Sequence, residues 1–202
     1  MGMGATMGLA PLAFLAVWTG MMAVMMAPSV APVGALYART VQTHRAPRVA
    51  AFAMAYGLVW GLAGIPALIL GTWLDRVTMD NPHAGRLALV AALVLFGAYE
   101  LTPLKQACLR HCRSPLGLLM HFASFQGPFR DLRAGLHHAG YCLGCCWALF
   151  VVLVAVGTMN LLAMAAIVAV VLVEKRWSRG VLFSHLAAVS ALVLAGVLAL
   201  TG

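Results

Sequence analysis

Six apolar runs, each close to the length of a membrane-crossing helix, dominate the sequence. They cover residues 9–26, 49–70, 87–101, 139–156, 159–173 and 181–200. About 20 helical residues cross about 30 Å of hydrocarbon, because an α-helix rises 1.5 Å per residue. The runs at 87–101 and 159–173 are short and would need to borrow a turn from their flanks. The pattern predicts an all-α, polytopic membrane protein, in which a bundle of about six transmembrane helices forms a single integral membrane domain over residues 1–202.

The composition agrees with this class and the charges suggest an orientation. Hydrophobic residues make up 63% of the chain and charged residues 9%, whereas a soluble domain is about half apolar and a quarter charged. Eleven of the thirteen Lys and Arg residues fall in the first, third and fifth loops between the runs. Because cytoplasmic loops are enriched in Lys and Arg, we expect these loops in the cytoplasm and both termini outside. The net charge of +8 then needs no nucleic-acid partner, and the lipid bilayer is the expected surroundings.

Several residues predict where the helices break. Pro28 and Pro32 predict that the first helix ends or kinks near Ala27, with residues 28–38 forming a short interfacial helix. The pair Thr102-Pro103 predicts a break after the third run. Asn160 is expected to cap the fifth helix, and the charged group that begins at Glu174 is expected to lie at a solvated boundary.

All five cysteines fall in the stretch from the end of the third run to the start of the fourth, on the side expected to face the reducing cytoplasm, so structural disulfides are not expected there. On a helix, Cys108, His111 and Cys112 share one face. A second face would carry His138, Cys142 and either Cys145 or Cys146. If the intervening loop folds back, the two stripes meet. Thiolates and imidazoles are ligands for zinc, Cu(I) and iron–sulfur clusters, whereas a single cysteine would more simply be a small apolar residue.

Two further groups are candidates for metal binding. Met21, Met22, Met25 and Met26 lie on one helical face and offer thioethers, which suit Cu(I), although methionine also fills gaps between packed helices. Glu100 is an ionisable residue at membrane depth, and such residues are commonly functional. It is expected either to pair with a cation such as Lys105 or to serve as a carboxylate ligand or proton acceptor.

Five segments occur together in an order that is specific. They are Trp18 followed by Met21-Met22-Ala23-Val24-Met25-Met26-Ala27-Pro28-Ser29; Tyr99-Glu100-Leu101-Thr102-Pro103-Leu104-Lys105 leading to Cys108 and Cys112; His138 with Cys142-Leu143-Gly144-Cys145-Cys146-Trp147; Met159-Asn160; and Glu174-Lys175. In this combination the chain resembles a family of bacterial integral membrane proteins described as predicted metal-binding proteins. The resemblance implies a metal-binding protein of the bacterial inner membrane. It leaves open which of Cys145 and Cys146 is the ligand.

These observations predict a metal-binding membrane protein that handles, transports or inserts Cu(I) through a cytoplasm-facing Cys/His cluster, with zinc as the alternative metal. One alternative function is an accessory or structural subunit of a membrane metalloenzyme, whose partners would be other membrane subunits or further copies of the chain. A second alternative is a membrane enzyme of the thiol-redox or metal-dependent kind. Because the sequence holds no phosphate-binding loop, nucleophile elbow or zinc-protease motif, we expect a binding protein rather than an enzyme.

Overall fold

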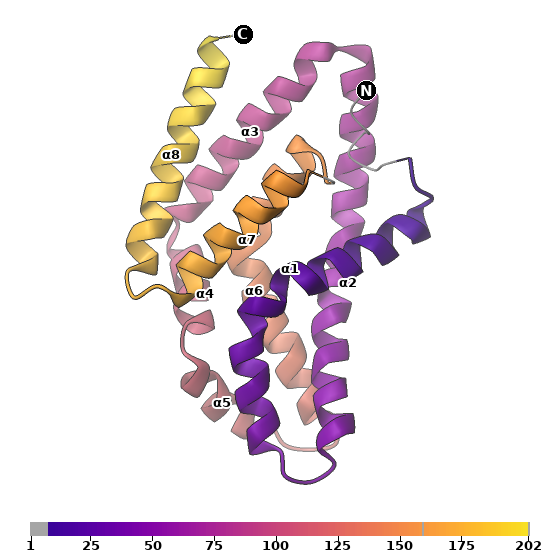
Figure 1. Ribbon diagram of the computed structural model, residues 1–202, viewed down its shortest axis with the longest axis vertical. Coiled ribbons are helices and arrows are strands. Elements are labelled where there is room, and N and C mark those ends of the chain that lie inside the picture. The colour runs from indigo at the N-terminus through magenta and orange to yellow at the C-terminus, as the bar shows by residue number, and fades with distance from the viewer. Residues whose placement is uncertain (1–7, 159, 202) are drawn as a thin grey trace.

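The computed structural model describes residues 8–158 and 160–201, and over these residues the chain forms eight α-helices and no strand (Figure 1). The helices are α1 (Pro11–Thr40), α2 (Arg45–Asp80), α3 (Pro82–Glu100), α4 (Pro103–Cys112), α5 (Pro115–Ala123), α6 (Arg130–Val156), α7 (Leu161–Arg176) and α8 (Gly180–Leu200). The predicted all-α class is confirmed.

Within the described residues, five helices are long and apolar enough to cross a membrane, namely α1, α2, α3, α6 and α8. The predicted run at 159–173 corresponds to α7, which has 16 residues and extends about 24 Å at 1.5 Å per residue. Met159 lies outside the described residues. The side chain of Asn160 accepts a hydrogen bond from Ala163 N at 3.1 Å, which confirms its predicted capping role. The fifth run is therefore a helix, but it is shorter than the hydrocarbon thickness it would have to cross.

Helix α1 continues through both of its prolines. The expected end near Ala27 and the separate helix over residues 28–38 are not formed, because Pro28 and Pro32 lie inside one helix of 30 residues. Figure 1 shows a sharp bend along α1, and a kink is the other outcome that the sequence predicts. Proline is a usual cause of such a bend because it removes a backbone hydrogen bond and crowds the preceding turn. Buried side chains on both sides, Met26 before and Val33 after, hold the two halves of α1 against the rest of the bundle.

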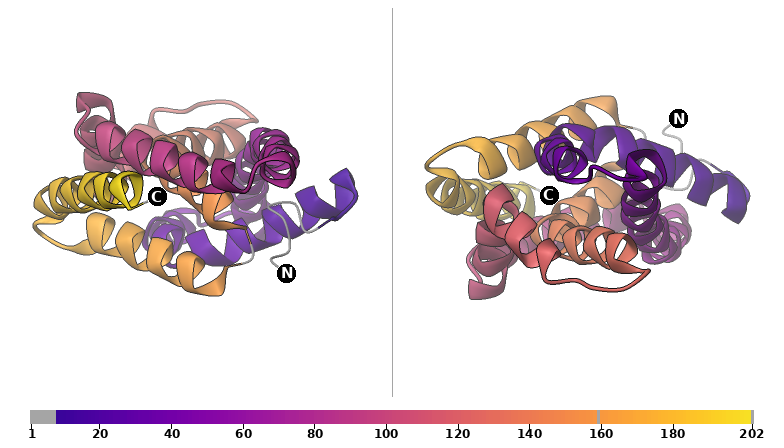
Figure 2. Two further views of the ribbon diagram at one scale, coloured as in Figure 1. Left: turned by 90° about the horizontal axis from the view of Figure 1, so that it is seen from above. Right: turned by 90° about the horizontal axis from the view of Figure 1, so that it is seen from below.

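Close helix contacts depend on glycine at two positions. A Cβ on Gly135 of α6 would lie 2.4 Å from the Phe52 carbonyl oxygen of α2. A Cβ on Gly97 of α3 would lie 2.7 Å from the Leu192 side chain of α8. Small residues allow helix backbones to approach in this way in membrane proteins. Figure 2 shows α8 lying between α3 and α7 when the molecule is viewed along its long axis.

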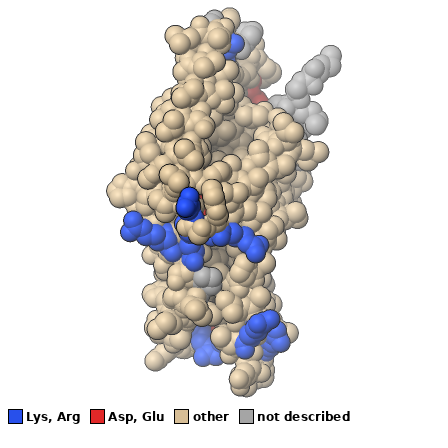
Figure 3. Space-filling view, turned by 60° about the vertical axis from the view of Figure 1, so that its left-hand side comes forward, with Lys and Arg blue, Asp and Glu red and all other residues tan. Residues whose placement is uncertain are grey.

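The two ends of the molecule differ in charge. The turn between α2 and α3 and the end of α8 lie at the top of Figure 1, whereas α5 and the turn between α1 and α2 lie at the bottom. On the face shown in Figure 3, most Lys and Arg side chains gather in two tiers, at mid-height and near the lower end, and a smaller basic patch lies near the top. At the lower end, Arg48 pairs with Asp131 at 3.0 Å, and Tyr37 donates a hydrogen bond to the same carboxylate.

Candidate metal centre

The break after α3 creates a short helix that carries two of the cysteines. Thr102 caps α4, since its hydroxyl accepts a hydrogen bond from Lys105 N at 3.2 Å, and Pro103 occupies the first turn, where a missing N–H costs nothing. The predicted break at Thr102-Pro103 is therefore confirmed. Cys108 and Cys112 lie one turn apart on α4, and both are buried. The chain thus directs these two thiols into the bundle.

The sulfur stripes of α4 and α6 meet, as the sequence predicts. Cys112 Sγ lies 4.0 Å from Cys145 Sγ, which is 3.4 Å from Cys146 Sγ. Cys108 packs close to α6 as well, because a Cβ on Gly144 would lie 3.0 Å from its sulfur. We call Cys108, Cys112, Cys142, Cys145 and Cys146 the thiol cluster; all five are buried free thiols.

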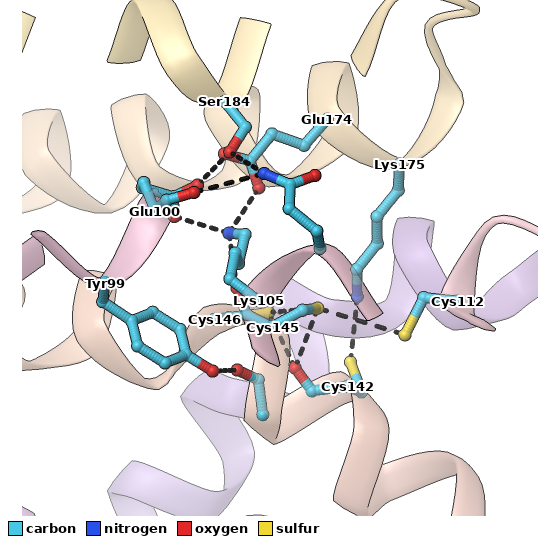
Figure 4. Close-up of polar contacts among 12 residues, drawn as sticks. Tyr99, Glu100, Lys105, Cys112, Cys142, Cys145, Cys146, Glu174, Lys175 and Ser184 are labelled. Carbon is cyan, nitrogen blue, oxygen red and sulfur yellow. Dashed lines mark hydrogen bonds and ion pairs between the residues drawn. The ribbon is translucent and has the colours of Figure 1, made fainter. Parts of the chain in front are cut away.

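Two polar groups from other helices contact the thiol cluster at Cys142, and Figure 4 shows the first of them, Lys175. Lys175 of α7 donates a hydrogen bond from Nζ to Cys142 Sγ at 3.0 Å. The hydroxyl of Tyr56 in α2 lies 3.2 Å from the same sulfur. The carbonyl of Cys142 accepts hydrogen bonds from Cys145 Sγ at 3.2 Å and Cys146 Sγ at 2.9 Å. Four helices therefore position this cluster.

A buried ion-pair network lies beside the thiol cluster. Lys105 Nζ contacts Glu100 at 2.5 Å and Glu174 at 2.9 Å, and it donates a hydrogen bond to the Cys145 carbonyl at 2.6 Å. Burial lowers the pKa of Lys105, but the carboxylates of Glu174 and Glu100 outweigh this and raise it above its ordinary value. Ser184 of α8 donates a hydrogen bond to Glu100. The carboxylate of Glu100 is thus already bound to Lys105 and Ser184.

The spacing of the candidate ligands does not predict the end of α7 or the start of α8 as parts of this region, although Glu174-Lys175 is one of the segments that carry the family resemblance. Glu174 is 2% exposed, so the expectation of a solvated boundary at Glu174 is wrong. The cause is long-range pairing, because Lys105 on α4 supplies the opposite charge inside the bundle. A Glu-Lys pair at the end of a short apolar run was the available signal. Ser184 gives no comparable signal, since serine is common in membrane helices.

The histidines divide between two locations. His138 is buried one turn before Cys142, and its ring stacks on Tyr56 at 5.7 Å between ring centroids. His111 lies elsewhere, stacked on Tyr141 at 3.8 Å and next to two further histidines. We call His111, His121 and His137 the histidine group; their ring centroids lie 4.4–6.3 Å apart. Of the histidines predicted as ligands, His138 therefore lies beside the thiols, and His111 belongs to this separate group.

The methionine face points inward. Met22, Met25 and Met26 are buried in the same hydrophobic cluster as the five cysteines, and Met21 is partly buried against it. The side chains of α1 therefore enter the same core as the thiols of α4 and α6.

As they stand, the side chains of residues 8–158 and 160–201 include no group of three or more His, Cys, Asp or Glu placed to hold a metal ion. A tetrahedral zinc site needs four ligands, so it would require several side chains to rotate. A metal ion held linearly by two sulfur atoms needs fewer ligands than a tetrahedral site. Metal–sulfur bonds of about 2.3 Å separate two sulfurs by about 4.6 Å when the three atoms lie in a line. The 4.0 Å between Cys112 Sγ and Cys145 Sγ is close to that value.

Comparison with known proteins adds the family. Comparison with curated proteins and with solved structures finds no match. A family model described as PpoB2, copper chaperone, matches residues 15–199. Its description agrees with the metal-related part of the resemblance seen in the sequence, and with copper as the metal. With nearly its whole length covered, the chain belongs to the PpoB2 copper chaperone family.

Proposed function

We propose that this protein is an integral membrane copper carrier that binds Cu(I) as cargo between Cys112 and Cys145. The observation that carries the proposal is the 4.0 Å separation of these two sulfurs, which come from α4 and α6 and face each other inside the bundle. Soft thiolates favour Cu(I), and the family description supports copper. Two ligands from different helices also allow release, since a small movement of α4 separates them.

Further sulfur and imidazole groups lie near the pair formed by Cys112 and Cys145. Cys142 and Cys146 lie within the same cluster, and His138 has a buried Nδ1 atom with no hydrogen-bond partner among the described residues. Met22 and Met26 share the core with the thiols. These groups would receive or pass on the ion as it moves to and from Cys112 and Cys145.

The orientation follows from the basic loops. Because eleven of thirteen Lys and Arg residues lie in alternate loops, the positive-inside rule supports a cytoplasmic position for α4 and the start of α6, in the inner membrane. Both termini would then lie outside, which requires α7, with its flanking turns, to make a sixth crossing beside the five longer helices. Reporter fusions at the C-terminus would test this. Activity of a reporter that works only in the cytoplasm would contradict it.

The central experiment measures Cu(I) bound to the full chain, purified in detergent under anaerobic, reducing conditions and titrated against a chromogenic Cu(I) chelator. We expect one Cu(I) per chain for the wild type and at least a hundredfold weaker binding for Cys112→Ser/Cys145→Ser. Cys108→Ser is the matched control, since it removes a thiol of the same helix outside the pair, and its affinity should stay within threefold. Wild-type protein that binds no Cu(I), or a double variant with wild-type affinity, would refute the proposal.

Metal exchange separates this function from that of a structural subunit. A carrier gives its ion to the chelator within minutes. A structural site in a larger assembly would hold zinc or copper without exchange, and would purify with other membrane subunits. X-ray absorption of the loaded protein identifies the metal and shows whether its ligands are sulfur atoms.

A further inference from the structure

Two lysines lie in the same layer of the bundle, but they have different partners (Figure 4). Lys105 contacts two carboxylates, those of Glu100 and Glu174. In the part of the chain that the structure describes, the Lys175 ammonium makes one hydrogen bond, to Cys142 Sγ at 3.0 Å. The adjacent carboxylate of Glu174 is directed to Lys105 instead. The charge of Lys175 therefore faces the sulfur atoms of the thiol cluster.

A buried charge is costly unless an opposite charge compensates it. Two thiolates that hold one Cu(I) carry a net charge of −1, and the ammonium of Lys175 brings the sum over the ion, its two thiolates and this lysine to zero. Two thiolates that hold one Zn(II) are already neutral, so the same ammonium leaves a net charge of +1. A third thiolate would neutralise the zinc form, but the described residues present no group of three ligands placed for a metal.

We propose that Lys175 is the counter-ion of the thiol cluster and makes it selective for a singly charged soft ion over a doubly charged one. This inference rests on the proposed binding of Cu(I) between Cys112 and Cys145, and it adds a specificity-determining residue on a third helix. Lys175 acts through charge and through its hydrogen bond to Cys142 rather than as a ligand. An arginine at position 175 would preserve the positive charge. A methionine would keep most of the side-chain length but would remove the charge.

The test compares Cu(I) and Zn(II) dissociation constants for the wild type, Lys175→Met and Lys175→Arg. Each full chain is titrated in detergent against a chromogenic chelator for each metal. We expect Lys175→Met to weaken Cu(I) binding at least tenfold without weakening Zn(II) binding, so that the ratio of the two constants changes at least tenfold. We expect Lys175→Arg to keep the wild-type ratio within threefold. Arg176→Met, at the exposed neighbouring position, is the matched control and should leave both constants unchanged.

A merely structural role for Lys175 predicts a different result, since loss of packing would weaken both metals equally and leave their ratio unchanged. That outcome, or unchanged affinities in Lys175→Met, overturns the inference while leaving the copper function intact. Absence of Cu(I) binding by the wild-type chain overturns both. If the methionine variant does not fold, Lys175→Gln gives the same comparison with a neutral polar side chain.

Discussion

The thiol cluster and the histidine group use the same two helices in opposite ways. Both include residues of α4 and α6, yet the thiols are buried in the bundle, whereas His121 is exposed on α5 and His111 and His137 are partly exposed. The thiols face Lys175 and Tyr56. The histidine rings contact each other and aromatic residues such as Tyr141. Residue type alone therefore does not identify a metal centre, because imidazoles also pack as aromatic rings.

The largest expected effect comes from breaking the buried ion-pair network of Lys105 beside the thiol cluster. Lys105→Met would leave the carboxylates of Glu100 and Glu174 uncompensated in the core, which costs about 3–5 kcal/mol of stability. Thermal unfolding of the detergent-purified chain, followed by tryptophan fluorescence, should show a clearly lower midpoint. Arg110→Met, at an exposed position of the same helix, is the control. Equal midpoints for both variants would show that the network does not hold the thiol cluster in place.

A smaller effect is expected from changing the spacing between α4 and α6. In Gly144→Ala the new methyl group would lie 3.0 Å from Cys108 Sγ, so the Cys108 side chain must give way, and we expect the packing of α4 against α6 beside Cys112 and Cys145 to change. Overpacking of this kind costs about 1 kcal/mol or more, and we expect a several-fold loss of Cu(I) affinity. Gly140→Ala, with no atom within 4 Å of its new methyl group, should bind normally. Equal Cu(I) affinities of the Gly144→Ala and Gly140→Ala variants would show that copper binding does not depend on the contact between Gly144 and Cys108.

The methionine face tests how far the centre extends. We expect Met22→Leu/Met26→Leu to weaken Cu(I) binding threefold to tenfold, because two thioethers leave the core that also holds the thiols. Stability should change by less than about 1.5 kcal/mol, since the volumes are similar. Met54→Leu, at a position 65% exposed, is the control. Wild-type affinity in the double variant would assign the methionines to packing alone.

The smallest effect is expected in the histidine group. His111→Phe/His121→Phe/His137→Phe keeps three aromatic rings and removes all six ring nitrogens. We expect the amount of Cu(I) bound per chain, and its dissociation constant, to remain within threefold of wild type. A loss of bound copper would join the two regions into one site and restore His111 to the ligand set.

Local features of the sequence predicted the helices well. Apolar length, helical spacing and proline chemistry act over a few residues, so the break at Thr102-Pro103, the cap at Asn160 and the placement of the cysteines on two helical stripes could all be predicted. The interior position of Pro28 and Pro32 could not, since packing on both sides keeps α1 helical there.

Long-range partners explain what remained beyond prediction. The separation of His111 from Cys108 and Cys112 reflects α5 and the residues after it, where His121 and Phe125 lie against the ring of His137. The helical spacing of His111 from the two cysteines is correct, but spacing alone does not show what a neighbouring helix offers each side chain. The partners of Glu174 and Lys175 likewise lie 69 and 33 residues away along the chain.

The break at Thr102-Pro103 places one sulfur of the pair on a helix of ten residues and the other on a helix of 27. An ion held between Cys112 and Cys145 would be a removable cross-link between positions 33 residues apart. Such a ligand stabilises the folded chain by mass action, by about 2.7 kcal/mol at a free concentration of 100 times Kd. Binding of the ion would therefore raise the free energy of unfolding, and release of the ion would lower it. The midpoint of a thermal unfolding curve would then report whether the protein holds an ion.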